Sequence, residues 1–295
     1  MEKSFTGRIG EGLALLRANN WSGSVDLALK ASQILEEVAA ADSFHAVLEG
    51  VCREMVRAQP SMAPIVNLCN LALWNGISPG ALRSVCAGFA AELTATSERI
   101  ARKAEELIDE DGAVLTYSYS RTVLDAVLAA HRAGRKFQVL CTESRPAGEG
   151  ASLARRLAEE GISVRLTIDA ALFDLVRRSD VVLVGADAIT ATSVVNKVGT
   201  ALVAQLARTF GRRVFVLAGL QKFVPTGYTL PQEAPKPPAE ILAEPPPGLE
   251  VDNHYFESTP LDWVAGVVTG DAVLAPWQAR EHLQADELHA ALRGL

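Results

Sequence analysis

Five short apolar runs, each followed by a helix-like stretch or a polar turn, constrain the fold of this chain more than any other feature. Runs without polar alternation are typical of buried parallel strands. The expected strands are residues 113–117, 136–141, 162–168, 180–185 and 213–219, and the expected helices are residues 121–133, 151–160, 171–177 and 198–209. Strands and helices that alternate at this spacing predict an α/β fold with a doubly wound parallel sheet.

The residues before the first apolar run have helical periodicity. Apolar side chains recur every three or four positions in residues 28–38, 44–51 and 85–107, and Ser24 is placed to cap the first helix. Residues 64–74 are apolar except for Asn67 and Asn70. We therefore expect a helical N-terminal domain at residues 1–108 and a ligand-binding domain with the sheet at residues 109–295.

Composition limits the classes of partner. The chain carries a formal net charge of -7 and has no long basic run, so we expect no direct contact with nucleic acid, although a local cationic pocket remains possible. No apolar stretch approaches the roughly 20 residues that cross a bilayer. The first residues lack the apolar core of a secretory signal. We expect a cytoplasmic protein that does not contact membranes.

The cysteines give no indication of a metal or redox site. None of the four, Cys52, Cys69, Cys86 and Cys141, belongs to a CxxC pair. Free cysteine is among the most buried residue types. We expect reduced, buried thiols and no bound metal.

Residues 231–248 hold seven of the 14 prolines. Proline fixes φ and removes a backbone donor, so this segment predicts an extended surface loop. A recognition peptide is the alternative, but a plain connection is favoured because loops run over surfaces and tolerate insertions. Residues 264–274 then predict a closing strand and turn.

In an open parallel sheet, ligands bind beyond the carboxyl ends of the strands. This rule selects polar residues that follow the expected strands: Ser118, Ser120, Arg121, Arg145, Asp187, Asn196, Lys197 and Lys222. The turn at residues 118–122 predicts either an anion site or a simple helix cap. Asn196 and Lys197 precede an expected helix, where a lysine opposes the helix dipole, and this conflict favours an anion-binding role.

Asp187 lies between an apolar strand and a loop of small residues. Burial there would raise its pKa and suit acid/base chemistry. The alternatives are a helix cap or a partner for Lys197, since structural ion pairs also perturb pKa values.

A nicotinamide site is disfavoured. It needs a glycine-rich turn between the first strand and its helix, and here that turn is SYSRT. Gly148 and Gly150 follow the second strand, but Leu153 occupies the third glycine position. Glu143 alone is a weak ribose contact. We expect no cofactor.

Several motifs together resemble a known family. They are VLTYSYSRTVL (114–124), ESRPAGEGASLA (143–154), VGADAI (184–189), NKVGT (196–200), QKFVP (221–225) and FESTPLDWVAGVVTGDAVL (256–274). In order and spacing they are similar to the alpha, beta and delta subunits of translation initiation factor 2B. They also resemble that family's enzymatic relatives, methylthioribose-1-phosphate isomerase and ribose-1,5-bisphosphate isomerase. The resemblance implies a helical domain on a Rossmann-like domain, and a homodimer built through the latter.

The resemblance also implies residue roles. The isomerases use a cysteine and an aspartate at the sugar carbons, and these positions fall on Ser118 and Asp187. A hydroxyl is far less acidic than a thiol. Cys141 ends the neighbouring strand and is a minor candidate for the same pocket. The enzymes' Arg-Gly phosphate loop is replaced by Ser22-Gly23, and a glutamine near the sugar by Glu149.

Three hypotheses follow. The first is a regulatory or altered protein of this group that binds a small phosphorylated sugar or nucleotide. The second is an aldose-phosphate to ketose-phosphate isomerase with Asp187 as acid/base. The third, a translation initiation factor subunit, rests on family analogy alone. The apolar segment 261–274 is the expected part of the dimer contact.

Overall fold

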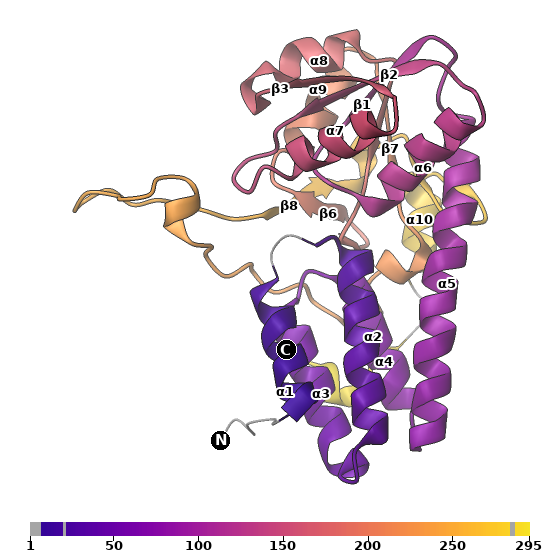
Figure 1. Cartoon of the computed structure of the whole chain (residues 1–295), viewed down its shortest axis with the longest axis vertical. Helices are drawn as coiled ribbons and strands as arrows, with labels where there is room; N and C mark the ends of the chain where they lie inside the picture. The colour runs from indigo at the N-terminus through magenta and orange to yellow at the C-terminus, as the bar shows by residue number, and fades with distance from the viewer. Residues whose placement is uncertain (1–6, 20–21, 284–286) are drawn as a thin grey trace.

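The chain folds into a helical bundle below and an α/β domain above, joined by one long helix (Figure 1). The computed structural model describes residues 7–19, 22–283 and 287–295. The N-terminal helices are α1 (Gly7–Ala18), α2 (Ser24–Ala40), α3 (Phe44–Ala58), α4 (Ala63–Asn75) and α5 (Pro79–Glu105). No described residue before β1 belongs to a strand, as the helical periodicity predicts.

The predicted doubly wound sheet is present. Its strands are β1 (Gly112–Thr116), β2 (Phe137–Thr142), β3 (Ser163–Thr167), β4 (Val181–Val184), β7 (Arg213–Leu217), β9 (Gly266–Val268) and β10 (Val273–Leu274). They lie in the order β10-β9-β7-β4-β1-β2-β3, and all neighbouring pairs except β9–β10 are parallel. The fold class inferred from the sequence is confirmed.

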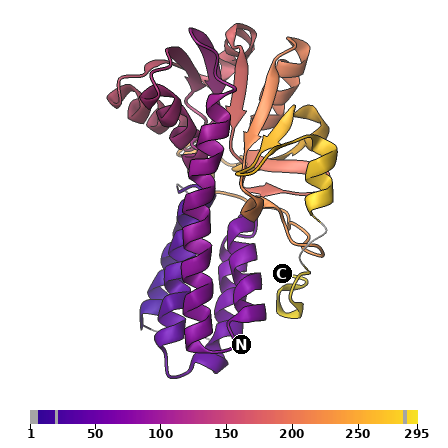
Figure 2. The ribbon, with the colours of Figure 1, turned by 90° about the vertical axis from the view of Figure 1, so that its right-hand side faces the viewer.

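Helices cover both faces of this sheet (Figure 2). They are α6 (Arg121–Arg132), α7 (Glu149–Glu159), α8 (Leu172–Arg178) and α9 (Thr200–Thr209). Adjacent strand residues point to opposite faces, so Val114 joins a core with α5, α6 and α7, while Leu115 joins a core with α8 and α9. The apolar runs lack polar alternation because both faces are buried.

One helix belongs to both domains. The first half of α5 contributes Leu82 and Phe89 to the core of the bundle, and the second half contributes Ile100 and Ala104 to a core of the sheet. The C-terminal residues return to the bundle, where Leu288 and Leu292 are buried. The two domains are therefore tied at several points along the chain.

A second sheet of three antiparallel strands was not expected. It consists of β5 (Ala188–Ile189), β6 (Ser193–Lys197) and β8 (Phe256–Pro260), in the order β5-β6-β8. The register pairs Asn196 with Glu257 and Lys197 with Phe256. Lys197 therefore ends a strand and precedes Gly199, the residue that caps α9, so it lies before a helix as expected. The anion-binding role inferred from the helix dipole stays a prediction.

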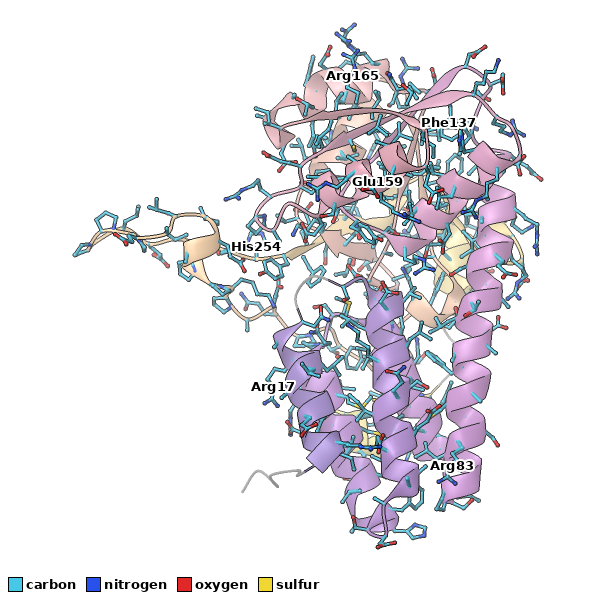
Figure 3. All side chains as sticks on the ribbon, viewed as in Figure 1. Arg17, Arg83, Phe137, Glu159, Arg165 and His254 are labelled. Atoms are coloured by element: carbon cyan, nitrogen blue, oxygen red, sulfur yellow. The ribbon has the colours of Figure 1, made fainter. Side chains whose placement is uncertain are left out.

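The proline-rich segment forms the expected surface loop. Residues 231–252, here called the arm, leave the body of the molecule and return to β8 (Figure 1). Residues 241–250 are all exposed. His254 marks the base of the arm (Figure 3).

Three other expectations from the sequence concern Ser24, the apolar segment 261–274 and the cysteines. Ser24 does not cap α2: Gly23 precedes the helix, and the Ser24 hydroxyl donates to the Ala186 carbonyl at 3.4 Å. The apolar residues of segment 261–274 mostly pack inside their own domain, so their apolarity no longer points to a subunit contact. All four cysteines are free and buried, as expected.

Among the described helices, none is both long enough and apolar enough to cross a membrane.

Gly199, which joins β6 to α9, is a position that only glycine fits. Its φ is +104°, and a Cβ there would collide with the Tyr117 ring. We expect Gly199→Ala to lower the free energy of unfolding by about 2–4 kcal/mol, because left-handed strain adds to the clash. Urea denaturation followed by circular dichroism measures the loss.

Gly134→Ala is the matched control. Gly134 has φ +89° but nothing within 4 Å of an added Cβ, so only the backbone strain of about 1–2 kcal/mol should remain. Equal losses for the two variants would show that the Tyr117 contact contributes nothing.

Candidate functional site

A pocket lies where the helical bundle meets the carboxyl edge of the parallel sheet. Its walls come from residues after β1 (118–121), after β4 (185–187), at the end of β6 and at the start of α2. Strand order reverses between β1 and β4, because β2 and β3 lie on one side of β1 and β4 on the other. The pocket therefore occupies the topological switch point, where ligands of open α/β sheets bind.

Most of the residues selected from the sequence line this pocket together. They are Ser118, Ser120, Arg121, Glu149, Asp187, Asn196, Lys197 and Lys222. Arg145 is the exception. It is exposed, and its guanidinium donates to the Glu240 carbonyl of the arm at 2.6 Å.

Asp187 is fixed by both domains. Its backbone N–H donates to Val195 at 2.8 Å, and its carbonyl accepts from the Ala63 N–H at the start of α4 at 2.9 Å. The residue keeps some exposure, toward the pocket that it lines. Burial raises the pKa of the Asp187 carboxyl, and the Lys222 ammonium and the Ser24 hydroxyl offset this only in part. Such a group can exchange a proton nearer neutrality than an ordinary aspartate.

Lys222 is the cation that acts most strongly on Asp187. It is 5% exposed and lies on the short 3-10 helix Leu220–Lys222, after β7. Burial lowers the pKa of the Lys222 ammonium, and the Asp187 charge works in the opposite direction. The pocket thus holds an acid and a base whose pKa values are shifted toward each other.

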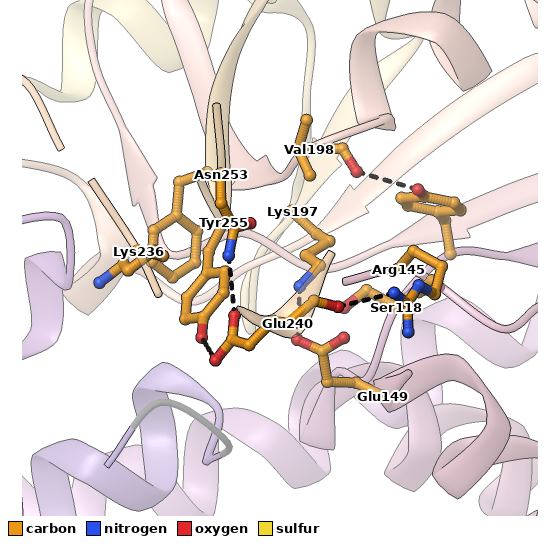
Figure 4. Close-up of polar contacts among 12 residues, drawn as sticks. Ser118, Arg145, Glu149, Lys197, Val198, Lys236, Glu240, Asn253 and Tyr255 are labelled. Carbon is orange, nitrogen blue, oxygen red and sulfur yellow. Dashed lines mark hydrogen bonds and ion pairs between the residues drawn. The ribbon is translucent and has the colours of Figure 1, made fainter. Parts of the chain in front are cut away.

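Lys197, which also lines the pocket, is paired with Glu149 (Figure 4). Its Nζ lies 2.6 Å from Glu149 Oε1 and 4.8 Å from the centre of the Tyr255 ring. The two charged side chains are only 4% and 14% exposed. Asn196, its neighbour, donates to Thr200 Oγ1 at 3.0 Å. Glu149 begins α7, where a negative charge suits the helix dipole.

The turn after β1 holds Ser118 in an unusual backbone conformation. Ser118 has φ +65°, and its N–H donates to Ser144 Oγ at 2.8 Å. Ser120 accepts from the Val123 N–H and caps α6. Gly185 lets the Ser120 side chain lie against the loop after β4, because a Cβ at residue 185 would strike that side chain. One expected role of the turn, the helix cap, is present, and the same turn faces the pocket.

Arg121 is half exposed and already paired. Its Nε lies 3.0 Å from Asp125 Oδ1, and its Nη1 lies 3.8 Å from Asp26 Oδ1. Cys141 does not line the pocket: its thiol faces the Arg165 carbonyl, and burial raises its pKa to about 12. The Cys141 thiol is therefore not placed to act in this pocket. In the described part of the chain, no cluster of three His, Cys, Asp or Glu side chains is arranged to hold a metal.

Sequence reasoning missed the walls supplied by Tyr255, Phe256, Gln59 and Met62. Tyr255 is the most informative, because its hydroxyl donates to Glu240 Oε1 of the arm at 2.5 Å. Glu240 Oε2 accepts from Asn253, and Lys236 of the arm also lies over the tyrosine ring, with its Nζ 4.8 Å from the ring centre. The arm is therefore anchored directly behind a wall of the pocket. Tyr255 follows the proline-rich segment closely, which was the available signal.

The fold and the pocket define an α/β protein with a polar pocket between a helical bundle and a doubly wound sheet. The model of the Initiation factor 2 subunit family matches residues 20–276. The chain belongs to this family.

Relatives within the family carry different functions. A crystal structure of translation initiation factor eIF-2B from Pyrococcus horikoshii superposes with a TM-score of 0.83 at 27% identity, covering 92% of this chain and 98% of that one. The chain is 27% identical to ribose 1,5-bisphosphate isomerase of Thermococcus kodakarensis, over 82% of this chain and 81% of that protein. It is 38% identical to methylthioribose-1-phosphate isomerase of Maridesulfovibrio salexigens, over 56% of this chain and 51% of that protein.

Tyr255→Phe tests the anchoring of the arm. The change removes the hydrogen bond to Glu240 and keeps the ring that Lys197 and Lys236 contact. Losing a bond to a charged acceptor, worth about 1.5 kcal/mol, should raise proteolytic cleavage of residues 237–252 roughly tenfold. Mass spectrometry after limited proteolysis locates the cuts.

Tyr228→Phe is the control, because the Tyr228 hydroxyl donates to the Pro60 carbonyl in the bundle. Cleavage of the arm at wild-type rate in Tyr255→Phe would show that this bond does not hold the arm.

Proposed function

We propose that the chain binds a small phosphorylated sugar in the pocket and interconverts its aldose and ketose forms. The observation that carries this proposal is Asp187, a carboxyl with a raised pKa that faces a ligand pocket beside Lys222. A carboxyl with a raised pKa is suited to proton transfer, because the best acid/base groups have pKa values near the operating pH. The isomerases among the relatives support the same reaction class.

Two helix N-termini supply the phosphate site. Gly23, Ser24 and Val25 at the start of α2, and Ser120 and Arg121 at the start of α6, line the pocket. The first N–H groups of a helix have no partner within the helix and carry partial positive charge. Phosphate binding at such ends follows from this arrangement, and Arg121 adds a full charge once it exchanges a carboxylate for the ligand.

In the proposed reaction of an aldose 1-phosphate, the Lys222 ammonium gives a proton to the ring oxygen as the bond between C1 and that oxygen breaks. The Asp187 carboxylate removes the proton from C2, and the C1–C2 double bond of an enol phosphate forms, with the phosphate kept on C1. Protonated Asp187 then returns its proton to C1, while the C2 hydroxyl gives its proton to Lys222 and becomes the ketone. No oxidant or reductant is needed. A lowered ammonium pKa makes Lys222 a stronger acid, and a raised carboxyl pKa makes Asp187 a stronger base.

A second candidate, a binding protein without turnover, is favoured by Ser118. By the resemblance this hydroxyl stands at the position of the isomerases' cysteine, and among the described residues no hydrogen bond joins it to a base that would activate it. A subunit role in translation rests on family membership alone. The homodimer also remains a prediction from the resemblance.

Asp187→Asn separates the two candidates. For an isomerase, removing the proton acceptor should reduce kcat by about 100-fold or more, with sugar-phosphate binding retained in weakened form. Ser118→Ala should cost only about 1 kcal/mol, the worth of one neutral hydrogen bond. Ketose formation from ribose 1-phosphate, ribose 1,5-bisphosphate and methylthioribose 1-phosphate is the assay.

Calorimetry on the same variants measures sugar-phosphate binding, for comparison with ketose formation. If the protein binds these sugar phosphates but forms no ketose, it is the second candidate, a binding protein without turnover. Full activity in Asp187→Asn, together with loss of activity in Ser118→Ala, would reverse the assignment.

The dependence of kcat/KM on pH follows from the same two groups. Asp187 must be ionised to act, so activity should fall as pH drops through its pKa, which lies above the ordinary 3.8. Lys222 must be protonated, so activity should fall as pH rises through its pKa, which lies below the ordinary 10.5. The plot of kcat/KM against pH should therefore be bell-shaped, and its two limbs should lie closer together than the ordinary pKa values of the two groups. An acid limb at or below pH 3.8 would exclude Asp187 as the base.

A further inference from the structure

We infer that the wall formed by Glu149 and Lys197 receives an uncharged, hydroxyl-bearing end of the ligand, so that the pocket selects sugar monophosphates over bisphosphates. Glu149 is the residue that sets this selectivity. The inference rests on the proposed sugar-phosphate site and names the substrate class within it.

The first observation is an unused acceptor. Glu149 Oε1 lies 2.6 Å from Lys197 Nζ, but the other oxygen, Oε2, is buried without a hydrogen-bond partner among the described residues. A buried polar atom without a partner costs free energy, and native structures contain few of them. Glu149 lines the pocket. A hydroxyl group of a bound sugar is a donor of the right kind for this oxygen.

The second observation is the balance of charge. Each of the three cations in the described lining faces a carboxylate: Lys197 faces Glu149, Lys222 acts on Asp187, and Arg121 lies beside Asp125 and Asp26. Only Arg121 is substantially exposed, at 50% of its side chain. One phosphate can draw on Arg121 and the two helix N-termini. A second phosphate has no such cation left.

A phosphate beside Glu149 would meet a like charge in a poorly solvated place, where repulsion is weakly screened. It would also have to take Lys197 from a pair in which both side chains are largely buried, and breaking such a pair leaves Glu149 uncompensated. A ligand amine is disfavoured for the converse reason, because the Lys197 ammonium is 2.6 Å from the same carboxylate. A neutral hydroxyl group avoids both penalties.

Glu149→Gln is the test. The change keeps the shape, removes the negative charge and frees Lys197 to bind a phosphate. Calorimetry with ribose 1-phosphate, ribose 5-phosphate and ribose 1,5-bisphosphate gives the affinities without requiring turnover. We expect wild type to bind at least one monophosphate about tenfold or more tightly than the bisphosphate, and Glu149→Gln to shift that ratio toward the bisphosphate by about tenfold or more.

Glu143→Gln is the matched control. It removes the same charge six residues earlier, outside the pocket lining, and should leave the ratio unchanged. If Glu149→Gln does not fold, the wild-type ratio alone decides. Wild type that prefers the bisphosphate, or that binds no monophosphate, overturns the inference, as does an unchanged ratio in a folded Glu149→Gln protein.

The outcomes separate this inference from the proposed function. If the protein prefers a monophosphate but forms no ketose, the proposed selectivity is supported and the proposed isomerase activity is rejected. If it forms ketose but prefers the bisphosphate, the isomerase activity is supported and the selectivity is rejected.

Discussion

The contact between the α4 start and the loop after β4 is the interaction on which the pocket depends. The Ala63 N–H donates to the Asp187 carbonyl, and Ser24 donates to Ala186 next to it. Asn67, a polar residue in an apolar helix, donates to the carbonyls of Gln221 and Phe223 on either side of Lys222. Because these bonds join helices of the bundle to loops of the sheet, they close one side of the pocket and hold both proton-transfer candidates.

Closure has an electrostatic consequence. Charged groups in the pocket lose water, so each depends on its neighbours for stabilisation. Burial shifts Asp187 and Lys222 in opposite directions, while Lys197 is held between Glu149 and the Tyr255 ring. The same burial that raises the pKa of Asp187 is accompanied by pairing of the pocket's cations with carboxylates, which leaves little free positive charge for anionic ligands.

The sequence predicts the main sheet well, because strands such as β1 and β4 are buried on both faces and therefore read as uninterrupted apolar runs. It also predicts that Ser118, Asp187 and Lys222 lie at one edge of the sheet, because each follows the carboxyl end of a parallel strand. It does not predict the second sheet. There β6 pairs with β8, about 60 residues later, and both are short. Glu149, the partner of Lys197, is 48 residues away in the sequence. No local sequence pattern predicts a contact over that separation.

The departures from the isomerases' residues change chemistry without changing shape. The backbone of Ser118 is held by its own N–H, through Ser144 Oγ, so replacing a thiol by a hydroxyl leaves the turn as it is. Glu149 begins α7 after Gly148, which adopts φ +77°, and a glutamine there would follow the same backbone. The scaffold thus fixes where groups stand, and under the proposed function single side chains decide which end of a ligand is tolerated and whether a proton moves.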